Sequence, residues 1–168
     1  NSMQESGDPI ECSTPFLIGA AWTPLGPPEE FRIIRLGKKI DAGADFVQTQ
    51  AVYDMPRFAA QVSRARDAGL TDRAAILAGI IIPRSAKMLR YMDQNVPGVT
   101  VPEALIKRME GVKDQKAEGI KVAIELIHEA RNIKGVRGAH LQAIESEELL
   151  PQVIQAAGLP AAFHDPLD

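Results

Sequence analysis

Cysteine is nearly absent from this chain of 168 residues, in which Cys12 is the only one. A single cysteine excludes a disulfide framework and a metal site built from several thiolates. This usage suits a reducing compartment, and we expect a cytoplasmic protein. No apolar run reaches the roughly 18 residues that a membrane-spanning helix needs, so we expect no membrane contact.

An excess of positive charge is also missing, because the formal net charge is −3 at pH 7. This balance argues against a surface that binds nucleic acid or another polyanion. The chain is 45% hydrophobic and 24% charged, which is ordinary for a soluble globular protein of one domain. Residues 1–15 predict an irregular segment without signal-peptide character. Since position 1 is not Met, we expect a fragment or a processed chain.

Motifs of several enzyme classes are lacking as well. The sequence contains no P-loop, no G-x-G-x-x-G fingerprint and no Ser/His/Asp arrangement. The three histidines, His128, His140 and His164, predict no metal site. His128 lies in an expected helix and His164 in an expected irregular tail, 160–168. His140 lies in an expected strand, where a buried structural role is the simpler interpretation.

The chain does contain short apolar runs that alternate with longer amphipathic segments. The runs predict strands at residues 16–22, 44–50, 74–82 and 138–144. Amphipathic segments between and after these runs predict helices. Four β–α units without a hairpin signal predict an α/β fold with a parallel sheet and right-handed crossovers. The sheet is either a small open one or half of an eight-stranded barrel.

Local signals place several helix starts. Asp54 and Ser85 are positioned to cap helices, and Pro102 opens a short one. Pro27 and Pro28 suit the first turn of the first helix, where proline lacks only an N–H that would be unpaired anyway.

The second expected strand ends in three polar residues, Gln48, Thr49 and Gln50. Ligands of parallel α/β folds bind at the carboxyl ends of the strands. Amide side chains there suit a heteroaromatic ring that carries N–H and C=O groups. The alternative is that these amides bond only to neighbouring loops.

A basic stripe lies on the helix before that strand. Arg32, Arg35 and Lys39 recur at i, i+3 and i+7, with Lys38 beside them. Such a stripe either holds a phosphate or diphosphate, or is a solvated helix flank. Trp22, the only tryptophan, is either a core residue or a stacking surface at a strand end.

Together these segments resemble the methylenetetrahydrofolate reductase family, flavin-dependent barrel enzymes of one-carbon metabolism. The stretches that carry the resemblance are GAAWTP, IRLGKKIDAGADFVQTQAVYD, AGIIIPRSAKMLRYM, VPGVTVP, GVRGAHLQAI and LLPQVIQAAGL. The similarity runs from Phe16 to Leu159 and looks closest to the branch of anaerobes and acetogens. It implies that residues 16–159 are a partial TIM (β/α)8-barrel domain, the second half with strands five to eight.

The resemblance also implies the ligands and their residues. Gln50, with Gln48 beside it, would face the pterin of methylenetetrahydrofolate. Lys39 matches the lysine that holds the FAD diphosphate, and Arg35 and Lys38 match neighbouring flavin contacts. Trp22 falls where an aromatic residue contacts FAD. The family's catalytic glutamate and the aspartate beside the flavin come from the first and fourth strands, so we expect no catalytic residue in this chain.

The function implied is part of an FAD-dependent oxidoreductase that reduces 5,10-methylenetetrahydrofolate to 5-methyltetrahydrofolate, in one-carbon and methionine metabolism. NAD(P)H or a redox partner protein would donate the electrons. We expect this chain to be inactive alone and to form an oligomer or a barrel completed by a partner. The alternative is a half-barrel module that binds or assembles without catalysis.

The chain departs from the family pattern at three positions. Leu89 and Asp93 stand where some members have a glutamine and a phenylalanine that bind folate and nicotinamide. Ser146 stands where an arginine binds folate. These departures leave open how the folate tail and the nicotinamide are held.

Overall fold

Four strands form a single parallel sheet in a computed structural model, which describes Ser6, Asp8 and residues 16–159. Cys12, His164 and the expected tail lie outside these residues. The strands are β1 (Gly19–Trp22), β2 (Phe46–Ala51), β3 (Ala75–Ile81) and β4 (Val136–Gln142). They lie side by side in chain order, and each pair of neighbours is parallel. The predicted parallel α/β architecture is confirmed, and β1 and β4 are the two edges of the sheet.

The outer strands differ from the predicted ranges. The first was predicted from Phe16, but β1 begins at Gly19, and Phe16 is 78% exposed. The chain before β1 is held through Ile18, whose N–H donates to the Asp45 carboxylate over 2.8 Å. The last strand was predicted to start at Gly138. It begins two residues earlier because pairing with β3 already starts at Val136.

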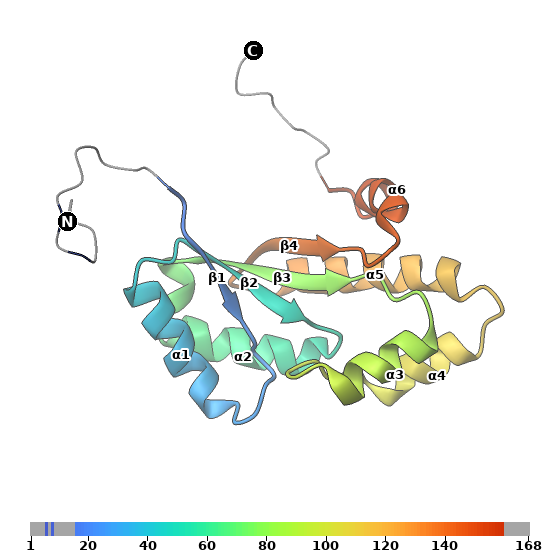
Figure 1. The fold of residues 1–168 in the computed structure, drawn as a ribbon, viewed down its shortest axis with the longest axis horizontal. Coiled ribbons are helices and arrows are strands. Elements are labelled where there is room, and N and C mark those ends of the chain that lie inside the picture. Colours follow the sequence, from blue (N-terminus) through green and yellow to red (C-terminus); the bar gives the residue numbers. More distant parts are fainter. Residues whose placement is uncertain (1–5, 7, 9–15, 160–168) are drawn as a thin grey trace, which may run out of the picture.

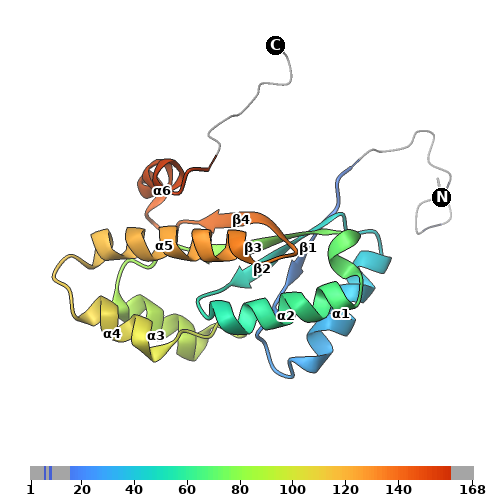
Figure 2. The ribbon, with the colours of Figure 1, turned by 180° about the vertical axis from the view of Figure 1, so that it is seen from behind.

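Three helices cover one face of the sheet. They are α1 (Glu30–Asp41), α2 (Met55–Asp67) and α5 (Gln115–Asn132). Figure 2 shows them in front of the strands, whereas in Figure 1 the opposite face of the sheet is free of helices. The structure thus has two layers over the described residues.

The remaining helices lie towards the carboxyl ends of the strands (Figure 1). They are α3 (Ala86–Asn95), α4 (Glu103–Glu110) and α6 (Leu150–Ala156), with the short 3-10 turn η2 (Glu147–Leu149) before α6. A second 3-10 turn, η1 (Leu70–Asp72), precedes β3 and lies at the amino end of that strand. Among the helices of the described residues, none has both the length and the apolar composition needed to cross a bilayer.

The predicted helix caps at Asp54 and Ser85 are confirmed. The Asp54 carboxylate accepts a hydrogen bond from Arg57 N–H at 3.1 Å, and the Ser85 hydroxyl accepts one from Met88 N–H at 3.1 Å. The predicted start at Pro27 and Pro28 is wrong, since α1 begins at Glu30. A residue that precedes proline avoids the α conformation, which keeps Pro27 out of the helix.

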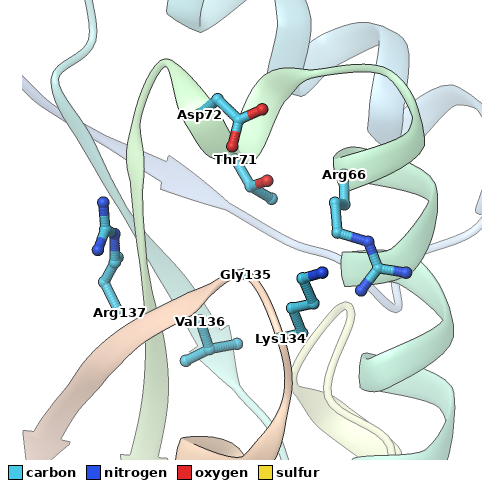
Figure 3. A pocket seen from close by; sticks show the side chains of 7 residues that line it. All are labelled: Arg66, Thr71, Asp72, Lys134, Gly135, Val136 and Arg137. Atoms are coloured by element: carbon cyan, nitrogen blue, oxygen red, sulfur yellow. The ribbon is translucent and has the colours of Figure 1, made fainter.

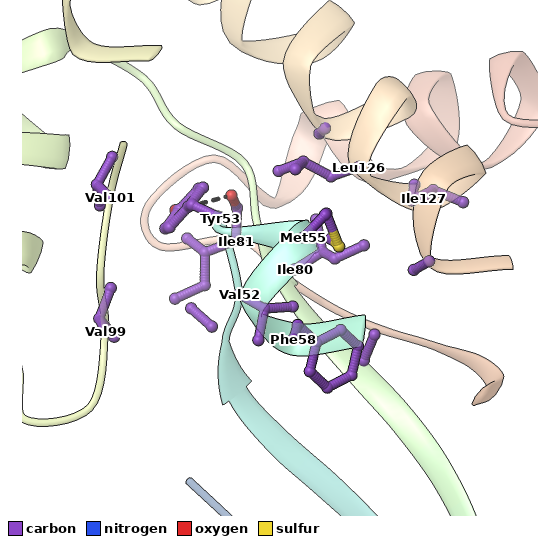
Figure 4. Packing of buried hydrophobic residues seen from close by; sticks show 14 of the residues in the cluster. Val52, Tyr53, Met55, Phe58, Ile80, Ile81, Val99, Val101, Leu126 and Ile127 are labelled. Atoms are coloured by element: carbon purple, nitrogen blue, oxygen red, sulfur yellow. Dashed lines mark hydrogen bonds between the residues drawn. The ribbon is translucent and has the colours of Figure 1, made fainter. Parts of the chain in front are cut away.

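The core lies between the sheet and its three covering helices. It includes Phe58 and Val62 of α2 together with Ile76 and Ile80 of β3, all fully buried. At the carboxyl end of the sheet, Tyr53 donates a hydrogen bond from its hydroxyl to the Ile81 carbonyl over 3.1 Å (Figure 4). Burial raises the pKa of this hydroxyl well above its ordinary value, so it stays a donor.

The opposite face, called the open face below, is less apolar and less buried. Along β2, buried residues point to the helices, while Phe46, Gln48 and Gln50 on the open face are half-buried. This alternation follows from the two-residue repeat of a strand. On β4 the open face carries His140 and Gln142, paired in register with Gly79 and Ile81 of β3.

Candidate functional site

A hollow of about 190 Å³ lies on the open face at the carboxyl ends of β1, β2 and β4. Its lining residues are Ala21, Trp22, Thr23, Gln48, Thr49, Gln50, His140 and Gln142. The structure therefore brings both predicted glutamines of β2 to one hollow. It adds two polar residues from a strand about ninety positions later in the chain, and the lining contains no carboxylate.

A bulge in β2 sets the direction of Gln50. Gln48 pairs with Leu77, but the next pair is Ala51 with Gly79, so β2 has one residue more than β3 in this interval. Such an extra residue bends the strand and redirects its side chains. Apart from the glycine at position 79, no local pattern in the chain indicated this bulge.

Side-chain hydrogen bonds replace the regular ladder at the bulge. The Thr49 hydroxyl accepts from Gly79 N–H at 2.8 Å and donates to the Gln50 carbonyl at 2.8 Å. Gly79 is needed because a Cβ there would lie 2.3 Å from the Thr49 carbonyl oxygen. Thr49 was predicted as one of three similar polar residues, but it is buried and structural.

The Gln50 amide oxygen bonds to the backbone, whereas, among the described residues, the amide nitrogen is free to face the hollow. The oxygen accepts a hydrogen bond from Ala51 N–H at 3.1 Å. The nitrogen forms no hydrogen bond within the described part of the chain, and the side chain lines the hollow. The oxygen is thus held locally while the two N–H donors can reach a ligand. Ligand binding by Gln48 and Gln50 stays a prediction.

His140 and Gln142 were not predicted as site residues. The structure places the His140 ring beside the Gln142 side chain, with Nδ1 and Nε2 3.4 Å apart, and both are half-buried in the wall of the hollow. The expectation of a buried core histidine is therefore wrong. Their i, i+2 spacing on a strand was the available signal, because it puts them on one face.

The basic stripe borders two hollows beside β1. Arg35, Lys38 and Lys39 line one of about 410 Å³ together with Ala42. A smaller one, of about 70 Å³, is shared by Arg35 and Lys39 with Trp22, among others. Lys39 donates a hydrogen bond to the Ala21 carbonyl of β1, which fixes its amine near the strand.

No carboxylate among the described residues pairs with Arg35, Lys38 or Lys39, although several other arginines form ion pairs. Three uncompensated cations beside one hollow fit a diphosphate, since arginine and lysine are the usual phosphate-binding side chains. The residues present therefore fit the group that the resemblance implies. Arg32 differs, because its guanidinium donates to the Gly26 and Pro27 carbonyls and secures the loop before α1.

Trp22 is a core residue. It is 3% exposed, and its ring packs against Phe58 with centroids 6.4 Å apart and a tilt of 52°. The alternative of a broad stacking surface is not supported by this burial. Its buried Nε1 has no hydrogen-bond partner in the described chain, and the residue lines two of the hollows. Contact with FAD stays a prediction.

The three departures from the family pattern have structural roles here. Leu89 is fully buried, and the Asp93 carboxylate accepts from Val101 N–H at 2.8 Å. Ser146 is 1% exposed and donates from its hydroxyl to the Ile144 carbonyl at 3.3 Å. Leu89 thus packs in the core, while Asp93 and Ser146 bond to nearby backbone.

The loop after β4 is held at the rim of the open face. Arg84 donates to the Glu145 carbonyl at 3.0 Å and to its carboxylate at 3.1 Å. Glu145 has φ of 51°, which is uncommon for a residue other than glycine. The two bonds from Arg84 stabilise this conformation, and Ile144 beside it is 48% exposed.

Chemically, the hollow offers amide and imidazole groups and therefore suits an uncharged polar ring edge better than an ion. Within the described residues, no group of three or more His, Cys, Asp or Glu side chains is placed to hold a metal ion. The side chains that line the hollow can donate and accept hydrogen bonds, and none of them is a carboxylic acid that could transfer a proton.

A family model and several curated proteins match this chain, and all of them carry the same family description. The family model described as methylenetetrahydrofolate reductase matches residues 12–158. Methylenetetrahydrofolate reductase 1 of Schizosaccharomyces pombe is 32% identical over 152 residues, which are 86% of this chain and 24% of that protein. The probable methylenetetrahydrofolate reductase (NADPH) of Caenorhabditis elegans is 26% identical, over 86% of this chain and 22% of that protein.

A third relative is methylenetetrahydrofolate reductase (NADH) 1 of Arabidopsis thaliana, 28% identical over 80% of this chain and 23% of its own length. The chain thus spans about a quarter of the length of these curated relatives. One solved structure, an uncharacterized protein from Clostridium thermocellum that binds two copies of 5-methyl-5,6,7,8-tetrahydrofolic acid, superposes with a TM-score of 0.61. It is 18% identical and covers 84% of this chain and 52% of that one, which supports the shared fold.

Proposed function

Because the chain belongs to the methylenetetrahydrofolate reductase family, we propose that it is the second half of the barrel of a flavin-dependent methylenetetrahydrofolate reductase. The observation that carries the proposal is the polar hollow on the open face, at the carboxyl ends of β1, β2 and β4 of the parallel sheet. That is where ligands bind in parallel barrels.

The half-barrel part of the proposal rests on the edges of the sheet and on its open face. The order β1-β2-β3-β4 leaves two edge strands, and four further strands would pair with both. The chain also covers 52% of its structural neighbour. The other half would cover the open face, including Phe46 and Leu77, which are half-buried in this chain.

The chain alone should therefore self-associate, since it exposes strand edges and an apolar part of the open face. Sedimentation velocity over a range of concentrations measures this. A soluble monomer that stays monomeric at high concentration and unfolds cooperatively would contradict the half-barrel proposal.

For the cofactor we propose FAD, with its diphosphate on Arg35, Lys38 and Lys39. When bound and reduced by the electron donor, FAD would supply the hydride that converts 5,10-methylenetetrahydrofolate to 5-methyltetrahydrofolate. The role of this chain is to bind and orient: the basic stripe neutralises the diphosphate, and Lys39 is already positioned by its bond to Ala21.

For the substrate we propose that the Gln50 N–H donors meet the pterin edge, with Gln48, His140 and Gln142 completing the polar wall. These groups exclude water from one side of the ring and fix its orientation. We propose NADH or NADPH as the electron donor, since relatives carry one or the other in their names. A redox partner protein is the alternative.

The decisive experiment uses Gln50→Glu in the complete protein. The substitution keeps the shape, exchanges the donors for an acceptor and adds a charge in a poorly solvated hollow. Binding of folate should weaken by about 1–3 kcal/mol. Flavin reduction by the electron donor should be almost unchanged. The two half-reactions are measured separately by stopped-flow absorbance of the flavin.

If the flavin is reoxidised slowly by folate but reduced normally by the electron donor, the assignment of Gln50 to the pterin is supported. Equal loss in both half-reactions would mean damage to the fold, and no loss in either would make Gln50 a structural strand-end amide. Gln152→Glu, on the exposed side of α6, is a matched control and should change neither half-reaction.

The flavin assignment is tested with Lys39→Glu. Loss of a charge-assisted bond should weaken FAD binding by about 1.5–3 kcal/mol, which is roughly ten-fold or more. FAD retention is measured after dialysis, with Lys39→Met as the control that keeps most of the stem. If Lys39→Glu retains FAD as well as the wild type does, the basic stripe is a solvated helix flank and not a diphosphate site.

A binding or assembly module without catalysis is the competing proposal, favoured by the absence of a carboxylate among the residues that line the hollow. The coding frame upstream of Asn1 distinguishes the two. Four more β–α units with a glutamate on the first strand support the enzyme, whereas a stop codon close upstream supports the module.

A further inference from the structure

A second polar hollow lies at the opposite end of the sheet, where β3 and β4 begin. It has a volume of about 310 Å³. Its lining residues are Arg66, Thr71, Asp72, Lys134, Gly135, Val136 and Arg137 (Figure 3). These residues come from α2, from η1, from the turn before β4 and from the first two residues of that strand. The proposed folate and flavin positions lie elsewhere, so the proposed function leaves this hollow without a role.

Three cations surround this hollow. Arg66, Lys134 and Arg137 form no ion pair with any carboxylate in the described part of the chain, while the hollow itself contains one carboxylate, Asp72. The excess of two positive charges favours an anion. Arg66 is also preorganised, because its guanidinium donates to the Ser63 hydroxyl over 3.1 Å.

Thr71 gives a second and independent indication. Only 8% of this residue is exposed, so it is more than nine-tenths buried, yet it lines the hollow. Its hydroxyl has no hydrogen-bond partner among the described residues. The residue is buried, but its hydroxyl oxygen keeps access to the hollow, so an anion there could accept a hydrogen bond from it.

The turn before β4 is fixed against Thr71 by close packing. Gly135 has φ of 105°, and a Cβ there would lie 3.1 Å from the Thr71 methyl carbon and 3.2 Å from a Val62 methyl carbon. Glycine therefore allows the turn to lie against η1, which brings Lys134 and Arg137 to the same hollow as Arg66.

We propose that this hollow binds a small phosphate ester that carries hydroxyl groups. Arginine and lysine side chains with a hydroxyl donor match the oxygens of a phosphate. The volume is in the range of small-molecule sites and leaves room for more than the phosphate. Asp72, acceptor-only when ionised, would bind the hydroxyl groups of the rest of the ligand.

The test is calorimetric titration of the complete protein loaded with FAD, so that the basic stripe on α1 is already occupied. The probes are ribose 5-phosphate, inorganic phosphate and ribose. We expect ribose 5-phosphate to bind more tightly than inorganic phosphate, and ribose not to bind measurably. Equal affinity for ribose 5-phosphate and inorganic phosphate would overturn the ester part of the proposal, because the hydroxyl groups would then contribute nothing.

Substitutions of residues that line the hollow test whether ribose 5-phosphate binds there. Lys134→Gln should weaken ribose 5-phosphate binding roughly ten-fold, the loss of one charge-assisted bond. Thr71→Val, which keeps the size of the side chain, should weaken it several-fold. The control Lys116→Gln removes an exposed lysine of α5 outside the hollow and should change nothing.

The unfolding midpoint of each variant is measured alongside, and Lys134 is exposed, so its replacement leaves the fold intact. Equal binding by the wild type, Lys134→Gln and Lys116→Gln would overturn the proposal, as would the absence of measurable binding by any phosphate probe. These results would leave the folate and flavin assignments untouched, because those rest on different residues and different titrations.

Discussion

The two faces of the sheet are formed by the same strands but differ in burial and in chemistry. On the face covered by helices, Val47 and Ile76 are fully buried and Thr49 is 4% exposed. On the open face, Gln48 and Gln50 alternate with these residues along β2 and are half-buried. Because successive residues of a strand point to opposite faces, one short segment presents buried residues to the helices and half-buried amides to the hollow. Three substitutions test this difference between the faces directly, and a fourth tests a contact between two of the covering helices.

The largest loss is expected on the covered face. Phe58 is fully buried against Trp22, so Phe58→Ala should lower the free energy of unfolding by about 3–5 kcal/mol through lost burial and a remaining cavity. The matched change Phe46→Ala on the open face should cost well under half of that in this chain. Urea denaturation at low protein concentration measures both, and equal losses would refute the difference between the faces.

The second largest loss of stability is expected at the bulge of β2 opposite Gly79. In Gly79→Ala the new methyl group would meet the Thr49 carbonyl oxygen, and we expect a loss of about 1–3 kcal/mol in unfolding free energy. The same change at Gly37 of α1 is the control. Its Cβ would meet only a Leu70 methyl carbon at 3.8 Å, so Gly37→Ala should stabilise by about 0.5–1 kcal/mol. A neutral Gly79→Ala would show that the bulge adapts freely.

A smaller and pH-dependent effect is expected at the junction of α1 and α2. The hydrogen bond from Arg57 lowers the pKa of Glu29, and Gln61 donates to the same carboxylate at 2.8 Å. Because this pKa is lower in the folded chain, the stabilisation is complete above the ordinary pKa of glutamate. It is lost as the pH falls through the lowered value.

Glu29→Gln should therefore cost about 0.2–1 kcal/mol near pH 7, and the difference from the wild type should vanish in acid. Unfolding curves at neutral and acidic pH measure this. A difference that does not change with pH would mean that the Glu29 charge does not contribute.

The smallest effect on stability is expected for Gln48→Ala on the open face. Its amide makes no hydrogen bond within the described residues, so the free energy of unfolding of this chain should change by less than about 0.5 kcal/mol. Folate binding by the complete protein should weaken in the same variant. A large loss of stability would place Gln48 among the structural residues.

Much of the local structure could be predicted because its causes are local. The caps at Asp54 and Ser85 depend on side chains that bond to backbone a few residues away. The apolar runs at residues 44–50 and 74–82 predicted β2 and β3 in nearly the observed places. The boundaries of β1 and β4 were less accurate, because they depend on where a neighbouring strand begins to pair.

The candidate site could be predicted only in part. The end of β2 and the basic stripe of α1 were found because each lies within one element and has a compositional signal. His140 and Gln142 were missed because their approach to Gln50 depends on the order of strands in the sheet. The burial of Trp22 was open for the same reason, since Phe58 belongs to a helix more than thirty residues away.

The sequence by itself determined the succession of strands and helices, the parallel class of the sheet and the family, because periodicity, caps and motifs are written along the chain. Only the tertiary structure decided which polar residues share a hollow. Three features join segments that are distant in sequence. They are the bulge at Gln50, the hydrogen bonds from Arg84 to Glu145 and the three cations around Gly135. Their meeting depends on the packing of helices on one face of the sheet, which no local pattern specifies.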